Sequence, residues 1–241
     1  MATISPISEE PQFTVSDFAL TVLAGFAGVL MVAVALGPFV DQATLLISSL
    51  FGQYAGHLLG MWFVLRRRGS SFGALGLDIE PSDGIYLFAG VALQFVIVLA
   101  FTPVAEWIGA EESSQTLAEQ IPDLEGAAVQ ALLVLSVALV APVTEEIMFR
   151  GLLPKVLGRW MGEGFSFTVA ALVFAFFHLL GVSGENLAQS LMLLVPQLFL
   201  VGLVLGWQAR RRRRLGVAIF IHSGFNLVAV LALLFAPDTF T

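Results

Sequence analysis

The segment AAVQALLVLSVALVAPVTEEIMFR, residues 127–150, decides the fold because it joins a long apolar run to a cluster of charges. Between residues 127 and 143 the only polar side chains are Gln130 and Ser136. A helix of this length and composition can cross the hydrocarbon core of a bilayer. Glu145, Glu146 and Arg150 follow directly. Ionisable groups are costly at membrane depth, so we expect a functional site here.

Helical geometry assigns different environments to the two adjacent acids. Glu146 and Arg150 are four residues apart and can form an ion pair, which is an ordinary way to hold a helix end. Glu145 points about 100° away from its neighbour, so its carboxylate is expected to stay free. Pro142 has no N–H, and we expect it to leave the carbonyl of Ala138 without a donor and to loosen the helix.

Composition excludes an ordinary soluble domain. The chain has 241 residues, of which 58% are hydrophobic and 12% charged, and its mean hydropathy is +0.91. These values are typical of a polytopic membrane protein. With no cysteine in the sequence, a disulfide, a thiolate nucleophile and a cysteine-ligated zinc are all excluded.

The apolar runs predict an all-α transmembrane bundle of about seven spans. We divide the chain into a tail (1–17), three N-terminal spans with their loops (18–126) and a helical core (127–241). An acidic loop between spans three and four is expected to hold a short helix at 116–120, and Pro103 is expected to kink or end the third span. The region 155–164 is expected to be an interfacial connection. The predicted spans are 18–40, 43–65, 84–108, 127–153, 165–180, 187–207 and 215–236.

The positions of the basic residues predict the orientation. All eleven lie in or beside the connections after spans two, four and six. The positive-inside rule then places the N-terminus in the cytoplasm and the C-terminus outside. The basic residues are Arg66, Arg67, Arg68, Arg150, Lys155, Arg159 and Arg210 to Arg214.

Two further spans carry polar residues that could join the acids. His178 lies deep in span five without an obvious local hydrogen-bond partner, so we expect its partner on another helix. His222 and Asn226 share one face of span seven, and Gly224 between them allows a neighbouring backbone to approach. His57, alone in span two, is expected to be a structural residue. A free glutamate, two histidines and an asparagine on three spans predict one convergent site.

Two chemistries fit these residues. In the one we prefer, Glu145 is a general base that activates a water also held by His178, while His222 and Asn226 stabilise the oxyanion. This mechanism requires no cofactor. In the alternative, Glu145, His178 and His222 bind a divalent metal such as zinc, which activates the water.

Three motifs in this order resemble the CPBP family of intramembrane proteases, also called the Abi or type II CAAX prenyl endopeptidase family. Glu-Glu-x-x-x-Arg is present as Glu145, Glu146 and Arg150, and Phe-x-x-x-His as Phe174 and His178. His-x-x-x-Asn is present as His222 with Asn226. The resemblance covers about residues 127–236, and the first three spans carry no motif.

The resemblance implies an endopeptidase whose first motif glutamate acts on water, in a helical bundle with a site open toward the cytosol. Glu146, Arg150 and Phe174 would support the site. Members have been described both as metalloproteases and as glutamate-type enzymes. The implied partners are the lipid bilayer and a membrane-associated peptide or protein, CAAX-type or bacteriocin-related, with no nucleic acid. The implied location is a bacterial cell membrane.

Two other functions compete with proteolysis. Some relatives act as non-enzymatic scaffolds or bacteriocin immunity proteins, which would keep the pocket and work by binding. A small transporter could use the buried Glu and His as a proton relay, although we find no internal repeat. One geometric conflict also needs resolution: Glu145 lies near the predicted inner end of span four, whereas His178 lies about 20 Å into span five by helical rise.

Overall fold

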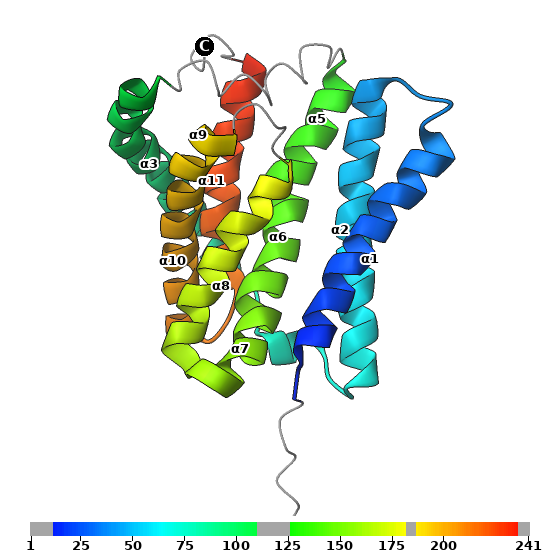
Figure 1. Cartoon of the computed structure of the whole chain (residues 1–241), viewed down its shortest axis with the longest axis vertical. Helices are drawn as coiled ribbons and strands as arrows, with labels where there is room; N and C mark the ends of the chain where they lie inside the picture. Colours follow the sequence, from blue (N-terminus) through cyan, green and yellow to red (C-terminus); the bar gives the residue numbers. More distant parts are fainter. Residues whose placement is uncertain (1–11, 110–125, 182–186, 236–241) are drawn as a thin grey trace, which may run out of the picture.

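The computed structural model describes residues 12–109, 126–181 and 187–235, and Figure 1 shows their helices packed side by side in one bundle. No strand occurs in these ranges, which confirms the all-α prediction. The helices of the first half are α1 (Val15–Leu36), α2 (Gln42–Arg67) and α3 (Leu87–Ile108). Those of the second half are α5 (Ala127–Leu135), α6 (Ala141–Glu146), α7 (Leu153–Met161), α8 (Glu163–Phe177), α9 (Leu187–Met192), α10 (Leu194–Arg212) and α11 (Gly216–Phe235).

Each predicted span corresponds to helical structure, and the protein is an integral membrane protein. Five helical stretches of the described chain are long and apolar enough to cross a bilayer. Helices α2 and α10 lie alongside them in the same bundle (Figure 1). The five are Val15–Leu36, Pro81–Ile108, Ala127–Met161, Glu163–Leu180 and Gly216–Phe235.

The fourth span is longer than predicted. Residues 127–161 form one continuous helical stretch, in which α5, α6 and α7 are joined by π-helical turns at Ser136–Val140 (η3) and Ile147–Leu152 (η4). The predicted connection at 155–164 is therefore wrong, because α7 continues to Met161. Gly162, with a φ of 74° that favours glycine, makes the turn into α8.

The first π turn adds to the carbonyls that Pro142 leaves free. The N–H of Ala141 donates five residues back, to Ser136, so the carbonyl of Val137 loses its α-helical donor. Its π-helical donor would be residue 142, and proline has no N–H. The side chain of Asn226 on α11 donates to the Val137 carbonyl instead. The vacancy at Ala138 stays a prediction, and the widened turn adds a second carbonyl, that of Val137, without its backbone donor.

Glycines bring helix backbones together at two interfaces. A Cβ at Gly28 or Gly52 would collide with the backbone of the facing helix in the α1–α2 hairpin, and one at Gly90 would collide with the Ile221 carbonyl on α11. A Cβ at Gly224 would collide with the Leu87 carbonyl on α3, which confirms the close approach predicted there. Helix α11 is thereby fixed closely against α3.

The third and sixth spans differ from the prediction in smaller ways. Pro103 lies inside α3, which continues to Ile108, so this proline does not end the span. The sixth span is interrupted at Leu193 because Pro196 cannot donate in a continuous helix and instead occupies the first turn of α10. The predicted helix at 116–120 and the first eleven residues of the tail lie outside the described residues.

The basic residues gather at one end of the bundle, the lower end in Figure 1. There Arg68 at the end of α2 pairs with Asp17 at the start of α1, with 2.7 Å between nitrogen and oxygen. Arg159 on α7 donates to the carbonyl of Phe13 at 3.3 Å. Helix α10 ends at the same end with its run of arginines.

Candidate active site

The imidazole of His222 lies between the two adjacent glutamates. Its Nδ1 is 2.9 Å from Oε1 of Glu146, and its Nε2 is 3.7 Å from Oε2 of Glu145. His222 is 2% exposed. The structure therefore brings the first and third motifs together, and it places Glu145 next to a histidine rather than apart from every partner.

Glu146 holds two groups through one oxygen. Its Oε1 accepts from Nη1 of Arg150 at 2.9 Å as well as bonding His222 Nδ1. Both members of the predicted Glu146–Arg150 pair are buried, with exposures of 0% and 4%. Because this carboxylate oxygen accepts from arginine, we assign the hydrogen of the second contact to His222 Nδ1. Sequence spacing predicted the ion pair but not the histidine that shares it.

The ring of Phe174 contacts both histidines and the arginine. Its centroid lies 4.5 Å from the His178 ring and 5.8 Å from the His222 ring, each in a T-shaped arrangement. The guanidinium carbon of Arg150 lies 4.2 Å from the same centroid, within the range of cation–π attraction. Phe174 is fully buried, so it fixes the positions of both imidazoles.

His178 finds its partner on its own helix, contrary to the prediction. Its Nδ1 donates to the carbonyl of Phe174 four residues earlier at 2.8 Å, since a carbonyl can only accept. The backbone changes here from α8 to a 3-10 turn, η5 (His178–Gly181), and the backbone N–H of His178 bonds Phe176 instead. The side chain thus replaces the missing helical donor, and Nε2 remains for another ligand.

Asn226 supports the same region from α11. Its Nδ2 donates to the Val137 carbonyl at 3.0 Å, across to the helix that carries the acids. An amide nitrogen has two hydrogens, so this contact leaves one N–H. The sequence grouped Asn226 with His222 by face alone and did not identify this bond.

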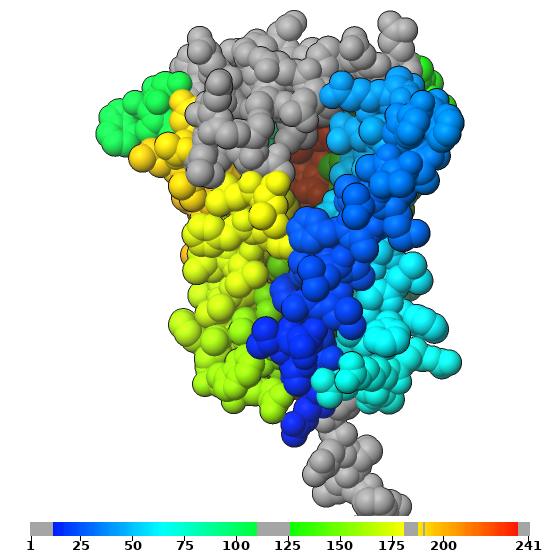
Figure 2. Space-filling view, turned by 45° about the vertical axis from the view of Figure 1, so that its right-hand side comes forward, coloured from blue at the N-terminus to red at the C-terminus, as the bar shows by residue number. Residues whose placement is uncertain are grey.

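The longer fourth helix explains how Glu145 and His178 can lie at the same height in the bundle. At the usual rise, Glu145 lies about 24 Å before the end of α7 and His178 about 22 Å after the start of α8. These two helix ends are joined through Gly162, so the two residues reach similar heights in the bundle. Figure 2 shows a hollow between α8 and the α1–α2 hairpin, with α11 visible at its floor.

The first two helices contribute two polar residues near the site. His57 is 3% exposed; its Nδ1 donates to the Thr21 carbonyl at 3.0 Å and its ring packs on Gly25, which fits the structural role expected for it. Tyr54 lies on α2, which packs against α6, the helix that carries Glu145. Sequence analysis did not select Tyr54, although it is one of only two tyrosines in the chain and lies within an apolar span.

The fit of a metal ion can be tested on the side-chain geometry. In the described part of the chain, no group of three His, Cys, Asp or Glu side chains is placed to hold one. Glu145, His178 and His222 are the ligands that the metal alternative would need. Their arrangement does not form such a group, and we derive no step through a metal.

The comparison with known protein families gives one match. Residues 127–228 match the family model described as type II CAAX prenyl endopeptidase Rce1-like. This match confirms the resemblance seen in the motifs and supports a protease within the membrane. It covers less than half of the chain but includes every motif residue from Glu145 to Asn226. No curated protein and no solved structure matches the chain.

Proposed function

We propose that the chain is an intramembrane endopeptidase in which Glu145 activates water to hydrolyse a peptide bond of a membrane-associated substrate. The observation that carries this proposal is the position of the Glu145 carboxylate. Its Oε2 is buried, accepts no hydrogen bond in the described structure and lies 3.7 Å from His222 Nε2. A carboxylate without a donor beside a histidine suits a general base.

In the proposed reaction, Glu145 removes a proton from a water molecule whose oxygen attacks the scissile carbonyl carbon. The water can also donate to Nε2 of His178, the nitrogen left free by the bond from Nδ1 to Phe174. The proton taken by Glu145 then passes to the leaving amine as the C–N bond breaks. One residue thus acts as base and then as acid.

Asn226 is proposed to stabilise the tetrahedral intermediate with its remaining N–H. Donors placed in advance stabilise developing negative charge because they need no reorganisation during the reaction. The bond to Val137 would orient the amide for this role. His222 donates from Nδ1 to Glu146, so it could donate to the oxyanion from Nε2 only as an imidazolium, and the proposed oxyanion role requires that form.

The Glu146–Arg150 pair is proposed to support the site rather than react. Arg150 holds Glu146 in place, and Glu146 sets the orientation of His222. A carboxylate that bonds one ring nitrogen of a histidine fixes which nitrogen carries the hydrogen. Glu145 would therefore take part in the reaction, and Glu146 would position His222.

The test is cleavage of a membrane-embedded peptide by Glu145→Gln, which keeps the shape of the side chain and removes the base. We expect at least a 100-fold loss of rate with unchanged melting temperature and peptide binding. Glu106→Gln, an exposed acid of α3, is the matched control. Normal turnover by Glu145→Gln would refute Glu145 as the base. Peptide binding without any cleavage by the wild-type protein would instead favour a scaffold that works by binding.

The substrate class is proposed from the family match to be a CAAX-type C-terminus. Peptides with and without a prenyl group, otherwise identical, would show whether the lipid is required. We also propose a cytoplasmic N-terminus and an active site reached from the cytoplasmic side, because the basic residues gather at the end where α1 begins.

A further inference from the structure

A second site lies at the basic end of the bundle, outside the cluster of glutamates and histidines. It is a pocket of about 540 Å³ between the start of α1, the 3-10 helix η1 (Phe72–Leu75), α7, α8 and the end of α10. Six cations and one carboxylate are among its lining residues. They are Arg150, Lys155, Arg159, Arg210, Arg213 and Arg214, with Glu163.

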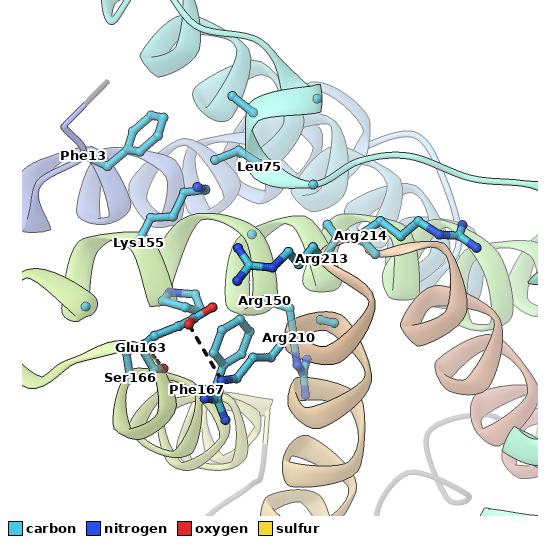
Figure 3. Close-up of a pocket in the computed structure, with 18 of the residues that line it drawn as sticks. Phe13, Leu75, Arg150, Lys155, Glu163, Ser166, Phe167, Arg210, Arg213 and Arg214 are labelled. Atoms are coloured by element: carbon cyan, nitrogen blue, oxygen red, sulfur yellow. Dashed lines mark hydrogen bonds and ion pairs between the residues drawn. The ribbon is translucent and has the colours of Figure 1, made fainter. Parts of the chain in front are cut away.

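The cations of this pocket exceed the acids that could neutralise them. Arg214 pairs with Asp83 at 2.7 Å, and Arg210 is 4.0 Å from Glu163. Lys155 and Arg213 have no ion pair in the described structure. Figure 3 shows Lys155 extending from α7 toward Phe13, Arg213 reaching across α7 from the turn after α10, and Arg210 on the other side of α7 near Phe167. Among the described residues, the pocket therefore carries an excess of positive charge.

Arg150 also lines the pocket, but its guanidinium group lies on the side of the glutamate and histidine cluster. Arg150 is 4% exposed, and its Nη2 has no hydrogen-bond partner within the described residues. Its Nη1 is already bound to Glu146. The guanidinium carbon lies 4.2 Å from the centroid of the Phe174 ring, so the cations available to a ligand in the pocket are the other five lining bases.

The backbone that presents Arg213 is held in an uncommon conformation. Arg213 has a φ of 56°, the only positive value of a non-glycine residue in the described chain. The turn is fixed on both sides: the Leu215 N–H donates to the Gly76 carbonyl at 2.8 Å, and Arg214 is anchored on Asp83. Arg213 is the C-cap residue of α10, where a left-handed conformation commonly ends a helix, and the surrounding contacts fix where its side chain leaves the backbone.

Tryptophans mark the level of the membrane interface at this end. Trp62, Trp160 and Trp207 are each more than half exposed, and they lie close in sequence to the terminal bases of α2, α7 and α10. Arg66 and Arg211 stack over Trp62 and Trp207 at 5.7 and 5.3 Å. Exposed tryptophans next to basic residues are typical of the headgroup region, where lipid phosphates are found.

From these observations we infer that the pocket binds a phosphate-bearing anion, and that its position at the interface favours the headgroup of an anionic phospholipid. Lys155 and Arg213 would neutralise the phosphate. The apolar walls formed by Phe13, Leu75 and Leu215 suit the glycerol backbone of a lipid. Peptidase activity is not needed for this binding, so the inference stands independently of the proposed reaction.

The test measures the melting temperature of the whole chain in an uncharged detergent with short-chain phosphatidylglycerol added. Phosphatidylcholine of the same chain length, glycerol 3-phosphate and inorganic phosphate are compared at equal concentration. We expect phosphatidylglycerol to raise the melting temperature by about 5 °C or more at saturation. Phosphatidylcholine, whose headgroup carries no net charge, should give little change.

The deciding variant replaces Lys155 and Arg213, both exposed, with glutamine. This double variant should fold normally, and phosphatidylglycerol should raise its melting temperature much less than that of the wild type. The control replaces Arg67 and Arg211, which are equally exposed at the same end but do not line the pocket, and should keep the shift. An equal rise in melting temperature in both double variants would overturn the inference. So would the absence of any rise in the wild type with phosphatidylglycerol, glycerol 3-phosphate and inorganic phosphate. An equal shift with inorganic phosphate, lost in the pocket variant, would keep phosphate recognition and reject the lipid as its source.

Discussion

The side-chain nitrogen of Asn226 lies 3.0 Å from the carbonyl oxygen of Val137 and replaces the backbone donor that Pro142 lacks. This single bond joins α11, which carries His222, to the helix that carries Glu145 and Glu146. Pro142 and Asn226, which are 84 residues apart in the sequence, therefore act on the same carbonyl group. The bond between Asn226 and Val137 holds the Glu-Glu-x-x-x-Arg motif and the His-x-x-x-Asn motif next to each other.

Asn226→Ala should lower both stability and rate. Loss of the donor leaves a buried carbonyl unsatisfied, which costs about 1–3 kcal/mol of unfolding free energy. Loss of an oxyanion donor should reduce the cleavage rate roughly 100-fold or more. Thermal unfolding in detergent and peptide cleavage measure the two effects separately.

A double-mutant cycle with Pro142→Ala tests the origin of the stability loss. Alanine at 142 restores an N–H that can bond the Val137 carbonyl in a π-helical turn. The stability cost of Asn226→Ala should then be smaller in the Pro142→Ala background, while the loss of rate should remain. Equal stability costs in both backgrounds would show that the Val137 bond is not what Asn226 contributes.

Glu146→Gln should act first on stability, in contrast to Glu145→Gln. It removes the charge that holds a buried guanidinium and orients His222, and breaking such a pair costs about 3–5 kcal/mol. Melting temperatures of the two variants, compared with the wild type, check this difference. A stable Glu146→Gln beside an unfolded Glu145→Gln would reverse the assigned roles.

Phe174→Leu should slow cleavage more than its cost in stability explains. Leucine keeps the site apolar but removes the ring that contacts both histidines, and we expect at least a tenfold lower rate. Phe149→Leu is the control, because Phe149 is equally buried and packs on Phe174 without a ring contact to either histidine. Similar losses of rate in the two variants would contradict a positioning role for Phe174.

Removal of divalent metals should leave cleavage unchanged if Glu145 acts on water directly. The assay is peptide hydrolysis after dialysis against a chelator, with and without added zinc. Activity that disappears on dialysis and returns with one equivalent of zinc would establish the metal mechanism. Glu145, His178 and His222 would then be its expected ligands.

The predicted orientation places residue 241 outside the cytoplasm. A reporter that is active only outside the cytoplasm, fused after Thr241, should therefore be active. The same reporter inserted after Gly69, next to the bases that end α2, should be inactive. Activity at the second position alone would invert the topology.

The sequence by itself determined the helical membrane class, the seven helical segments and the three motifs. Apolar length and the positions of Gly and Pro are local properties, and they carry that information. The spacing of Glu146 and Arg150 also determined their pair, because both lie on one helix face.

Only the tertiary structure decided which partners those residues meet. His222 between the two glutamates, Asn226 on the Val137 carbonyl and Phe174 against both imidazoles depend on how α6, α8 and α11 pack. The two π turns shift the register of the fourth helix, and neither composition nor periodicity indicates a widened turn. Contacts between helices distant in sequence follow from packing geometry, and local patterns constrain them only weakly.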